Sequence, residues 1–243
     1  MSAAHGRLLP LRLDDVGLAV DGHRLLQGIT ATIAVPGVTV VLGPNGAGKT
    51  LLMRLCRGLL RPSGGRIRWH DTRPGDAGTR VGYVPQLPAM LRRSVRANLA
   101  YALDRAGTAR AERQERIAEG LCLAGLDGRG EASARYLSGG ECQRLAIARA
   151  WVQRPAALML DEPSAHLDPT AVATIERTIA SIRDQGTKVI LTTHDLHQAR
   201  RLADEVLFIH AGRLLEQTPA ASFFDSPATA EAHTFISGEL LAA

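Results

Sequence analysis

The chain has 243 residues, of which 45% are hydrophobic and 22% are charged. These proportions are ordinary for a soluble globular protein and argue against a disordered chain. No apolar stretch reaches the ~18–20 residues that a membrane span needs, and the first residues lack the apolar run of a signal peptide. We therefore expect residues 1–243 to form one globular domain in the cytoplasm, unless a partner holds it at a membrane.

The formal net charge is +5, and the basic residues are scattered rather than gathered in one patch. This distribution argues against a nucleic-acid partner. Only two of the basic residues are lysines, Lys49 and Lys188, so the placement of Lys49 is informative. The three cysteines (Cys56, Cys122 and Cys142) are odd in number and widely spaced. They predict reduced thiols rather than disulfides or a zinc site.

The sequence pattern up to residue 86 predicts several short strands and one helix. Residues 38–42, Val-Thr-Val-Val-Leu between two glycines, are typical of a buried parallel strand. An apolar helical segment follows, from residue 49 to residue 60. Further extended stretches are expected at 11–20, 29–35, 65–70 and 80–85.

Residues 87–137 change to a helical pattern, with segments rich in Arg, Ala and Glu at 94–104 and 109–125. Strands and helices then alternate again, with strands at 157–160, 188–193 and 205–210 and helices at 170–185 and up to 202. Two short helices are expected after about 217. This alternation predicts a mostly parallel sheet covered by helices, with a helical insertion in the middle.

Residues 43–50 carry the strongest chemical signal, because Gly-Pro-Asn-Gly-Ala-Gly-Lys-Thr fits G-x-x-x-x-G-K-[ST] between a strand and a helix. Glycines let backbone N–H groups turn inward, and the following helix adds its positive end, so that together they cradle a triphosphate. Lys49 would neutralise the β- and γ-phosphate oxygens, and the Thr50 hydroxyl would bind Mg²⁺. The predicted phosphate-binding residues are Gly43, Pro44, Asn45, Gly46, Ala47, Gly48, Lys49 and Thr50.

Residues 156–163 read Ala-Ala-Leu-Met-Leu-Asp-Glu-Pro, a buried strand with two carboxylates at its end. Ligands of open α/β sheets bind at that edge. Asp161 can hold Mg²⁺ through its water shell, and Glu162 can polarise the water that attacks the γ-phosphorus. Alone, such an acidic pair is more often a helix cap. Beside residues 43–50, the catalytic interpretation is the stronger one.

Ser138, Gly139 and Gly140 open a helix that is expected to run to about residue 152. Their backbone N–H groups lie at a positive helix end, which suits a second phosphate contact. Ser138 together with Glu141, three residues later, is also a capping box. One geometry serves both roles, so both interpretations stand.

Six ordered motifs resemble those of the ATP-binding cassette of ABC transporters, and the resemblance covers nearly the whole chain. They are GPNGAGKT at 43–50, Gln86 in Tyr-Val-Pro-Gln, LSGGE at 137–141, LMLDEP at 158–163, SAHLD at 164–168 and His194 in Leu-Thr-Thr-His. The resemblance implies an α/β P-loop fold with a mostly parallel core and an N-terminal antiparallel β-subdomain. The implied divisions are a RecA-like core at about 1–86 and 155–217, a helical subdomain at about 87–154 and a short helical tail at 218–243.

The resemblance also implies ATP and Mg²⁺ as cofactors, and it assigns roles that no local pattern reveals. Gln86 would link Mg²⁺ and the attacking water to the helical insertion, and so sense a membrane partner. His194 would contact the γ-phosphate and position Glu162. Without the resemblance, His194 is a lone histidine after a strand, which is more often structural.

The family works as a dimer, and this implies that a second copy of the chain completes the site. Ser138 and Gly140 would bind the γ-phosphate of the ATP that the other copy holds, so that two copies close head to tail around two ATPs. Asp168 would pass the state of one site to the other.

Two positions depart from the family pattern. Family members commonly carry an aromatic residue that stacks on adenine, and the aligned position here is Val20, with no aromatic nearby. Loss of such a stack is typically worth ~1–3 kcal/mol. His166 stands where Asn is commoner, between Ser164 and Leu167. We expect a tuned site rather than a broken one.

Further partners are implied only by the resemblance. Transmembrane permease subunits would hold the chain at the cytoplasmic face of the membrane, and an extracytoplasmic solute-binding protein would complete the system. Residues 87–91, Leu-Pro-Ala-Met-Leu, are the expected permease contact if they are exposed. The charged helix at 109–125 is more simply a solvated face.

The stretches at 195–204, 223–227 and 237–240 resemble importer ATPases of the tungstate and related oxyanion group. They also resemble those of the phosphate and polar amino-acid groups, so tungstate import is the first of several hypotheses. About 27 residues follow Glu216, too few for the extra β-domain of long sugar importers. A soluble ATPase of the iron–sulfur assembly type is the alternative from another class.

Overall fold

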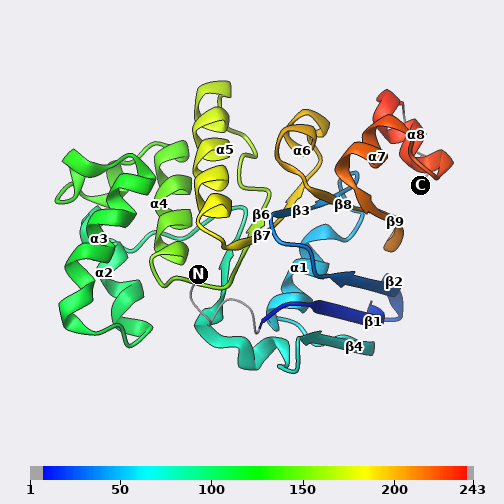
Figure 1. Ribbon diagram of the computed structural model, residues 1–243, viewed down its shortest axis with the longest axis horizontal. Coiled ribbons are helices and arrows are strands. Elements are labelled where there is room, and N and C mark those ends of the chain that lie inside the picture. The colour runs from blue at the N-terminus through cyan, green and yellow to red at the C-terminus, as the bar shows by residue number, and fades with distance from the viewer. Residues whose placement is uncertain (1–7, 240–243) are drawn as a thin grey trace.

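The computed structural model describes residues 8–239, and a six-stranded sheet lies at its centre (Figure 1). The strands are β5 (Val81–Val84), β6 (Ala157–Asp161), β7 (Lys188–Thr193), β3 (Val38–Leu42), β8 (Glu205–His210) and β9 (Arg213–Pro219), in that order. All neighbours pair in parallel except β9, which runs antiparallel to β8. The predicted mostly parallel sheet is therefore confirmed, and the sequence pattern does not predict the one antiparallel edge strand, β9.

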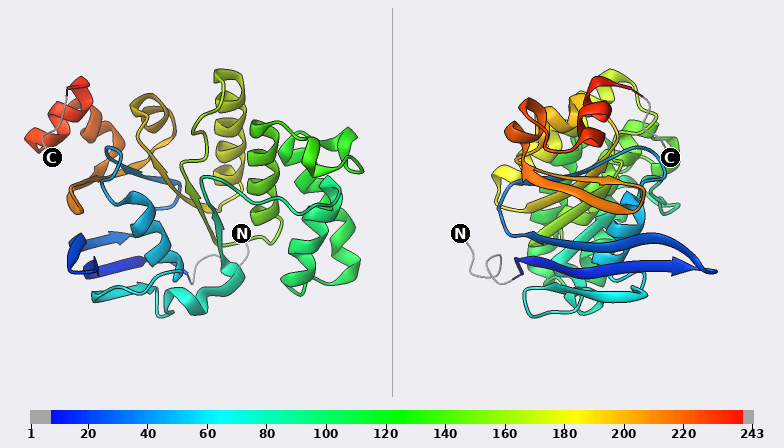
Figure 2. Two further views of the ribbon diagram at one scale, coloured as in Figure 1. Left: turned by 180° about the vertical axis from the view of Figure 1, so that it is seen from behind. Right: turned by 90° about the vertical axis from the view of Figure 1, so that its right-hand side faces the viewer.

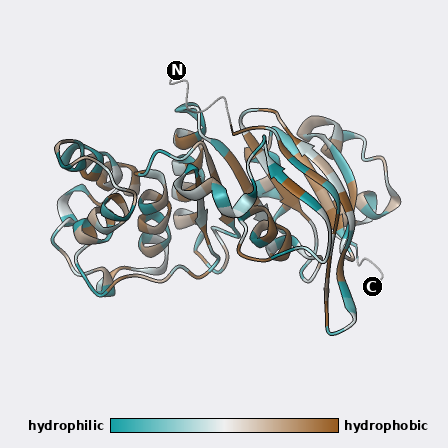
Figure 3. Ribbon diagram, turned by 90° about the horizontal axis from the view of Figure 1, so that it is seen from below, coloured by the Kyte–Doolittle hydropathy of each residue, from teal (hydrophilic) through white to brown (hydrophobic). Residues whose placement is uncertain are grey.

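The position of the central strands explains why their sequences are mostly apolar. Every residue of β3, β6 and β7 is buried, because helices or a second sheet cover both faces of a parallel sheet. Alternate residues enter different cores: Val38, Val40 and Leu42 pack on one face, and Val41 packs on the other. Figure 3 shows hydrophobic colour on strands and on the helices that lie beside them.

A second, three-stranded sheet is antiparallel throughout, as the resemblance implies. Its strands are β2 (His23–Ile33), β1 (Leu11–Val20) and β4 (Gly64–Trp69), in that order. The stretch predicted at 29–35 covers only the second half of β2, and residues 23–25 at the start of this strand are exposed. A hydrogen bond of 2.8 Å from Gln27 N to Gly212 O ties β2 to the turn before β9.

Three helices pack against the central sheet: α1 (Lys49–Arg57), α5 (Pro169–Asp184) and α6 (Leu196–Leu202). The helix expected at 49–60 ends early, because Gly58 adopts the left-handed conformation and its N–H bonds Arg54 O and Leu55 O. The two short helices expected near the end of the chain are α7 (Ala220–Asp225) and α8 (Ala230–Ser237).

The helical insertion lies at one end of the molecule (Figures 1 and 2). It contains α2 (Val95–Arg105), α3 (Arg110–Ala124) and α4 (Gly139–Trp151). Apolar side chains of these helices, such as Leu99, Leu121 and Leu145, join the core on one face of the central sheet. Among residues 8–239, no helix is both long and apolar enough to cross a membrane.

Candidate nucleotide site

The loop between β3 and α1 can only be built with glycine at two positions. At Gly43, φ is 156°, and a Cβ would lie 2.0 Å from the carbonyl oxygen of Ile209. At Gly48, φ is 101°, and a Cβ would lie 2.5 Å from Cδ2 of Leu26. The backbone therefore turns tightly against β8 and β2 and enters α1 with its N–H groups at the positive helix end.

Lys49 lies inside this loop, with only 5% of its side chain exposed. Its Nζ donates hydrogen bonds to Gly43 O (2.9 Å) and Pro44 O (3.0 Å) and is 3.5 Å from Glu162 Oε1. Burial lowers the pKa of the ammonium, and the neighbouring Glu162 carboxylate opposes that shift. A cation is therefore held where the loop would hold phosphate groups.

Asp161, at the end of β6, is buried and has both carboxylate oxygens hydrogen-bonded. Its Oδ1 accepts from Thr50 Oγ1 at 2.9 Å and from Thr192 Oγ1 at 2.8 Å, and its Oδ2 accepts from Tyr83 Oη at 3.1 Å. Burial, followed by the Asp161 charge, raises the pKa of Tyr83 to about 12. The phenol therefore keeps its proton at neutral pH and acts as the donor.

Glu162 follows directly and turns its carboxylate toward the loop. The side chain is 13% exposed, with Oε1 facing Lys49 and Oε2 lying 3.3 Å from His194 Nδ1. Its φ of 44° is in the left-handed region, a strained conformation that persists in proteins mainly at functional sites. Its N–H is held by Thr192, through the carbonyl (3.2 Å) and the hydroxyl (2.9 Å).

A pocket of about 490 Å³ brings most of the predicted residues together at the carboxyl ends of the strands. Its lining contains the phosphate loop, the predicted Gln86, Glu162 and His194, and also His166. The full lining is Asn45, Gly46, Ala47, Gly48, Lys49, Thr50, Leu51, Gln86, Glu162, His166 and His194.

Gly43, Pro44 and Asp161 are not part of this lining, although Lys49 and Thr50 bond to them. Three further groups of predicted residues lie outside the pocket. Ser138 caps α4 in a complete capping box with Glu141, so the structural interpretation of this motif holds. Gly139 and Gly140 form the first turn of that helix. Asp168 caps α5, accepting hydrogen bonds of 3.0 Å from Thr170 N and Ala171 N. Val20, 49% exposed, ends β1 opposite His23.

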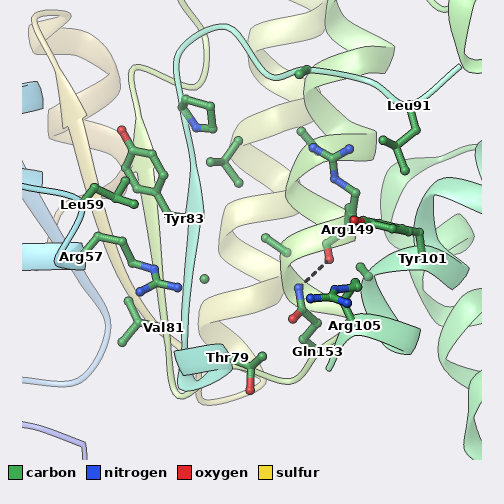
Figure 4. Close-up of a pocket in the computed structure, with 17 residues that line it drawn as sticks. Arg57, Leu59, Thr79, Val81, Tyr83, Leu91, Tyr101, Arg105, Arg149 and Gln153 are labelled. Atoms are coloured by element: carbon green, nitrogen blue, oxygen red, sulfur yellow. Dashed lines mark hydrogen bonds between the residues drawn. The ribbon is translucent and has the colours of Figure 1, made fainter. Parts of the chain in front are cut away.

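A second groove, of about 520 Å³, is lined by residues of the strand β5 and of the helices α2 and α4 (Figure 4). Tyr83, Arg57 and Leu59 lie on its one side, and Arg105 and Arg149 lie on the other. Three arginines and no acidic residue occur among the described residues that line it. Ala89 and Leu91, from the segment expected to contact a partner, also line it, and the neighbouring Leu87 is 85% exposed.

The sequence does not predict a role for two residues of the site, Thr192 and Tyr83, and it indicates His166 only as a departure from the family pattern. Thr192 and Tyr83 hold the Asp161 carboxylate, and His166 lines the pocket. Tyr83 stands in the quoted Tyr-Val-Pro-Gln motif, but only the pairing of β5 with β6 reveals its direction. His166 has a φ of 63°, where Asn and His are more common than most residues, and its departure from the family pattern is the one available signal.

The parallel sheet with a phosphate loop after its central strand defines the class of P-loop nucleotide-binding proteins. Residues 26–165 match the family described as ABC transporter. The chain is 36% identical over 253 residues to the "Phosphate import ATP-binding protein PstB 2" of Natronomonas pharaonis, covering 94% of this chain and 89% of the relative. It is also 36% identical over 196 residues to the "Tungstate uptake system ATP-binding protein TupC" of Peptoclostridium acidaminophilum, covering 80% and 92%.

Comparison with solved structures points to the same family. The chain resembles cbiO1 of Clostridium perfringens, described as part of the ABC transporter complex cbiONQ, with a TM-score of 0.81 and 29% identity over 89% of this chain and 90% of that one. A structure described as the ATP binding subunit of an ABC transporter has a TM-score of 0.82 at 23% identity, covering 94% of this chain and 100% of that one, and supports the fold. The chain belongs to the ABC transporter family, as an ATP-binding subunit of the importer type, and its reaction is ATP hydrolysis.

Proposed function

We propose that this chain hydrolyses Mg²⁺-bound ATP in a head-to-tail homodimer attached to transmembrane permease subunits, and so drives import of a small solute. The observation that carries the proposal is that Lys49, Glu162 and His194 meet in one pocket. Glu162 lies between the other two, with Oε1 3.5 Å from Lys49 Nζ and Oε2 3.3 Å from His194 Nδ1. Glu162 and His194 directly follow β6 and β7, and Lys49 begins α1 after the loop that follows β3. All three therefore lie at the carboxyl-end edge of the central sheet, where open α/β sheets bind ligands.

The donor set beside the phosphate loop fits Mg²⁺. Thr50 Oγ1 and Asp161 Oδ1 are 2.9 Å apart, and Gln86 lines the same pocket as Thr50. Hard oxygen donors such as these are the ligands that Mg²⁺ prefers, usually with several waters and substrate phosphates. Thr50, Gln86 and Asp161 would hold the ion, which supplies charge neutralisation at the β- and γ-phosphate oxygens.

The protein residues have separate tasks in hydrolysis. Lys49 would exchange its two backbone acceptors for phosphate oxygens, where its charge opposes the charge that builds up in the transition state. Glu162 would accept the proton of the attacking water, because its carboxylate faces the loop beside that cation. His194, 3.3 Å from Glu162, would orient that carboxylate and contact the γ-phosphate.

The second copy accounts for the residues outside the pocket. Ser138 is exposed at the N-terminus of α4, and an exposed helix N-terminus binds phosphate readily. We assign Ser138, Gly139 and Gly140 to the ATP held by the other copy. Asp168, exposed at the start of α5, would lie at the boundary between the two copies and link the sites.

The groove beside β5 is the docking surface that we assign to the permease. Its three arginines, without an acidic neighbour in the described lining, favour a permease segment that carries a carboxylate. Exposed Leu87 and the lining residues Ala89 and Leu91 add apolar contact at its edge. Through the permease the chain would lie at the cytoplasmic face of the membrane.

The solute is proposed from relatives alone. Tungstate or a related oxyanion is our first proposal, and relatives named for tungstate uptake, phosphate import and methionine import match this chain with the same 36% identity. Phosphate and polar amino acids are the alternatives within transport that the sequence resemblance implies, and the methionine relatives add an apolar amino acid. An iron–sulfur assembly ATPase is the alternative outside it.

Affinity purification of the tagged chain from its own cells in mild detergent, followed by mass spectrometry, tests the proposed function. We expect a protein with several membrane spans in about equal amount to the chain. Recovery of soluble partners alone would contradict the transport proposal and favour the assembly ATPase. The solute-binding protein of the recovered system is then tested with tungstate, molybdate, phosphate and methionine, and tight binding of one of them decides the solute.

Replacing Val20 with tyrosine tests where adenine lies. We assign Val20 to the adenine contact, and Leu26 of the same hairpin lies against Gly48 of the phosphate loop. Val20→Tyr should tighten ATP binding by up to about 1–3 kcal/mol through base stacking. Titration with ATP and with triphosphate alone measures the change, which should appear only with ATP.

Ala19→Tyr is the matched control, because successive residues of a strand point to opposite faces. An unchanged ATP affinity in Val20→Tyr, or an equal change in both variants, would show that Val20 does not lie under the base.

A further inference from the structure

Tyr83 belongs to two surfaces at once. Its ring lines the groove on the same side as Leu59 and Arg57 (Figure 4). Its hydroxyl leaves the groove and donates a 3.1 Å hydrogen bond to Asp161 Oδ2. This reach follows from the sheet register, because Tyr83 of β5 pairs with Met159 of β6, two residues before Asp161. Side chains two residues apart on a strand point to the same face.

The three donors to Asp161 are not equivalent. The hydroxyls of Thr50 and Thr192 both donate to Oδ1, and a threonine hydroxyl that holds a cation through its oxygen still has its proton to donate. Tyr83 is the donor to Oδ2 among the described residues. Two donors on different oxygens fix the plane of a carboxylate, whereas one leaves it free to rotate. Tyr83 therefore decides whether the carboxylate stays in its binding orientation.

We propose that Tyr83 is a positioning residue for Mg²⁺ and that it couples the wall of the groove to the Asp161 carboxylate. This inference rests on the proposed function, which makes Asp161 a metal-binding residue and the groove a docking surface. A permease segment that packs on the ring restricts the ring and its hydroxyl together. Because coupling between two sites is reciprocal, Mg²⁺ at Asp161 should in turn change the groove wall.

The phenylalanine variant separates positioning from a general structural role. Tyr83→Phe keeps the ring and removes only the hydroxyl. ATP affinity is measured by calorimetry in EDTA and again in Mg²⁺, and the ratio of the two affinities is the readout. We expect an unchanged affinity in EDTA and an increase on adding Mg²⁺ that is smaller by about tenfold, the low end of the usual effect of losing such an outer contact.

Tyr101→Phe is the matched control, because Tyr101 also lines the groove and the same atom is removed. Its Mg²⁺ response should equal that of the unmodified chain. The same response in Tyr83→Phe would overturn the proposal. An equal loss of affinity in EDTA and in Mg²⁺ would overturn it too, since that indicates a general defect. Failure of the unmodified chain to bind ATP would instead contradict the proposed function.

The groove itself provides a second readout. Leu59 lines the groove and is 57% exposed, so a Leu59→Cys variant can carry an environment-sensitive dye, with Cys122 and Cys142 replaced by serine. Adding Mg²⁺ to the ATP-bound protein should change the dye emission, and Tyr83→Phe should abolish that change. An emission that ignores Mg²⁺, or a response that persists in Tyr83→Phe, would contradict the coupling.

Discussion

Glu162→Gln should lower the rate of ATP hydrolysis by about 10²–10⁴-fold, the usual contribution of a general base, while ATP still binds. The amide has the shape of the carboxylate but cannot accept the proton of the attacking water. ATP binding should be retained because the backbone oxygens of Gly43 and Pro44, and not only Glu162, hold the Lys49 ammonium in the phosphate loop. Phosphate release at saturating ATP and calorimetric titration with ATP measure the two effects separately.

Glu115→Gln is the matched control, because Glu115 is exposed on α3 and the charge change is the same. Its hydrolysis rate should equal that of the unmodified chain. If Glu162→Gln hydrolyses ATP at the full rate, another group accepts the proton. His194, 48% exposed beside Glu162, would then be the next residue to test.

Lys49→Ala should lose most of its affinity for ATP, by at least about a hundredfold. The ammonium is the cation of the phosphate loop, and each hydrogen bond to a charged group is worth about 1.5–3 kcal/mol. Two lost bonds to phosphate oxygens at the lower figure correspond to about a hundredfold. Calorimetry with ATP and with triphosphate should show the same loss, because the contact is to the phosphates and not to the base.

Arg61→Ala removes an equal charge from an exposed position after α1 and should bind ATP normally. Thermal denaturation controls for folding, because Lys49→Ala also leaves the largely buried Glu162 without its cation. An unchanged affinity in a folded Lys49→Ala protein would contradict the assignment of residues 43–50 to phosphate.

The central strands are predictable from the sequence because burial on both faces leaves a continuous apolar run. The predicted strands at 38–42, 188–193 and 205–210 coincide with β3, β7 and β8. The edges of the sheets are less predictable. Strand β9 and the first half of β2 carry mixed polar and apolar residues. A hydrogen bond from Gln217 Nε2 to Thr32 O (2.8 Å) joins β9 to the end of β2 across the two sheets. Such pairing depends on tertiary contacts that no local pattern records.

The residues of the site also differ in how well the sequence predicts them. Residues 43–50, Asp161 and Glu162 can be found from the sequence, because a glycine loop and a strand-end acidic pair have their own chemical logic. Thr192 and Tyr83 cannot, because they reach Asp161 only when β7 and β5 flank β6, as the order of the central sheet has it. The adjacency of those three strands is a property of the topology, and their sequences are separated by long helical segments.

We infer that ATP is hydrolysed in a site completed by a second copy of the chain. Light scattering of Glu162→Gln, with and without Mg²⁺ and ATP, tests this inference. We predict a molar mass of 26.0 kDa without nucleotide and twice that mass with Mg²⁺ and ATP. A protein that binds one ATP per chain and keeps the mass of a single chain would contradict the claim.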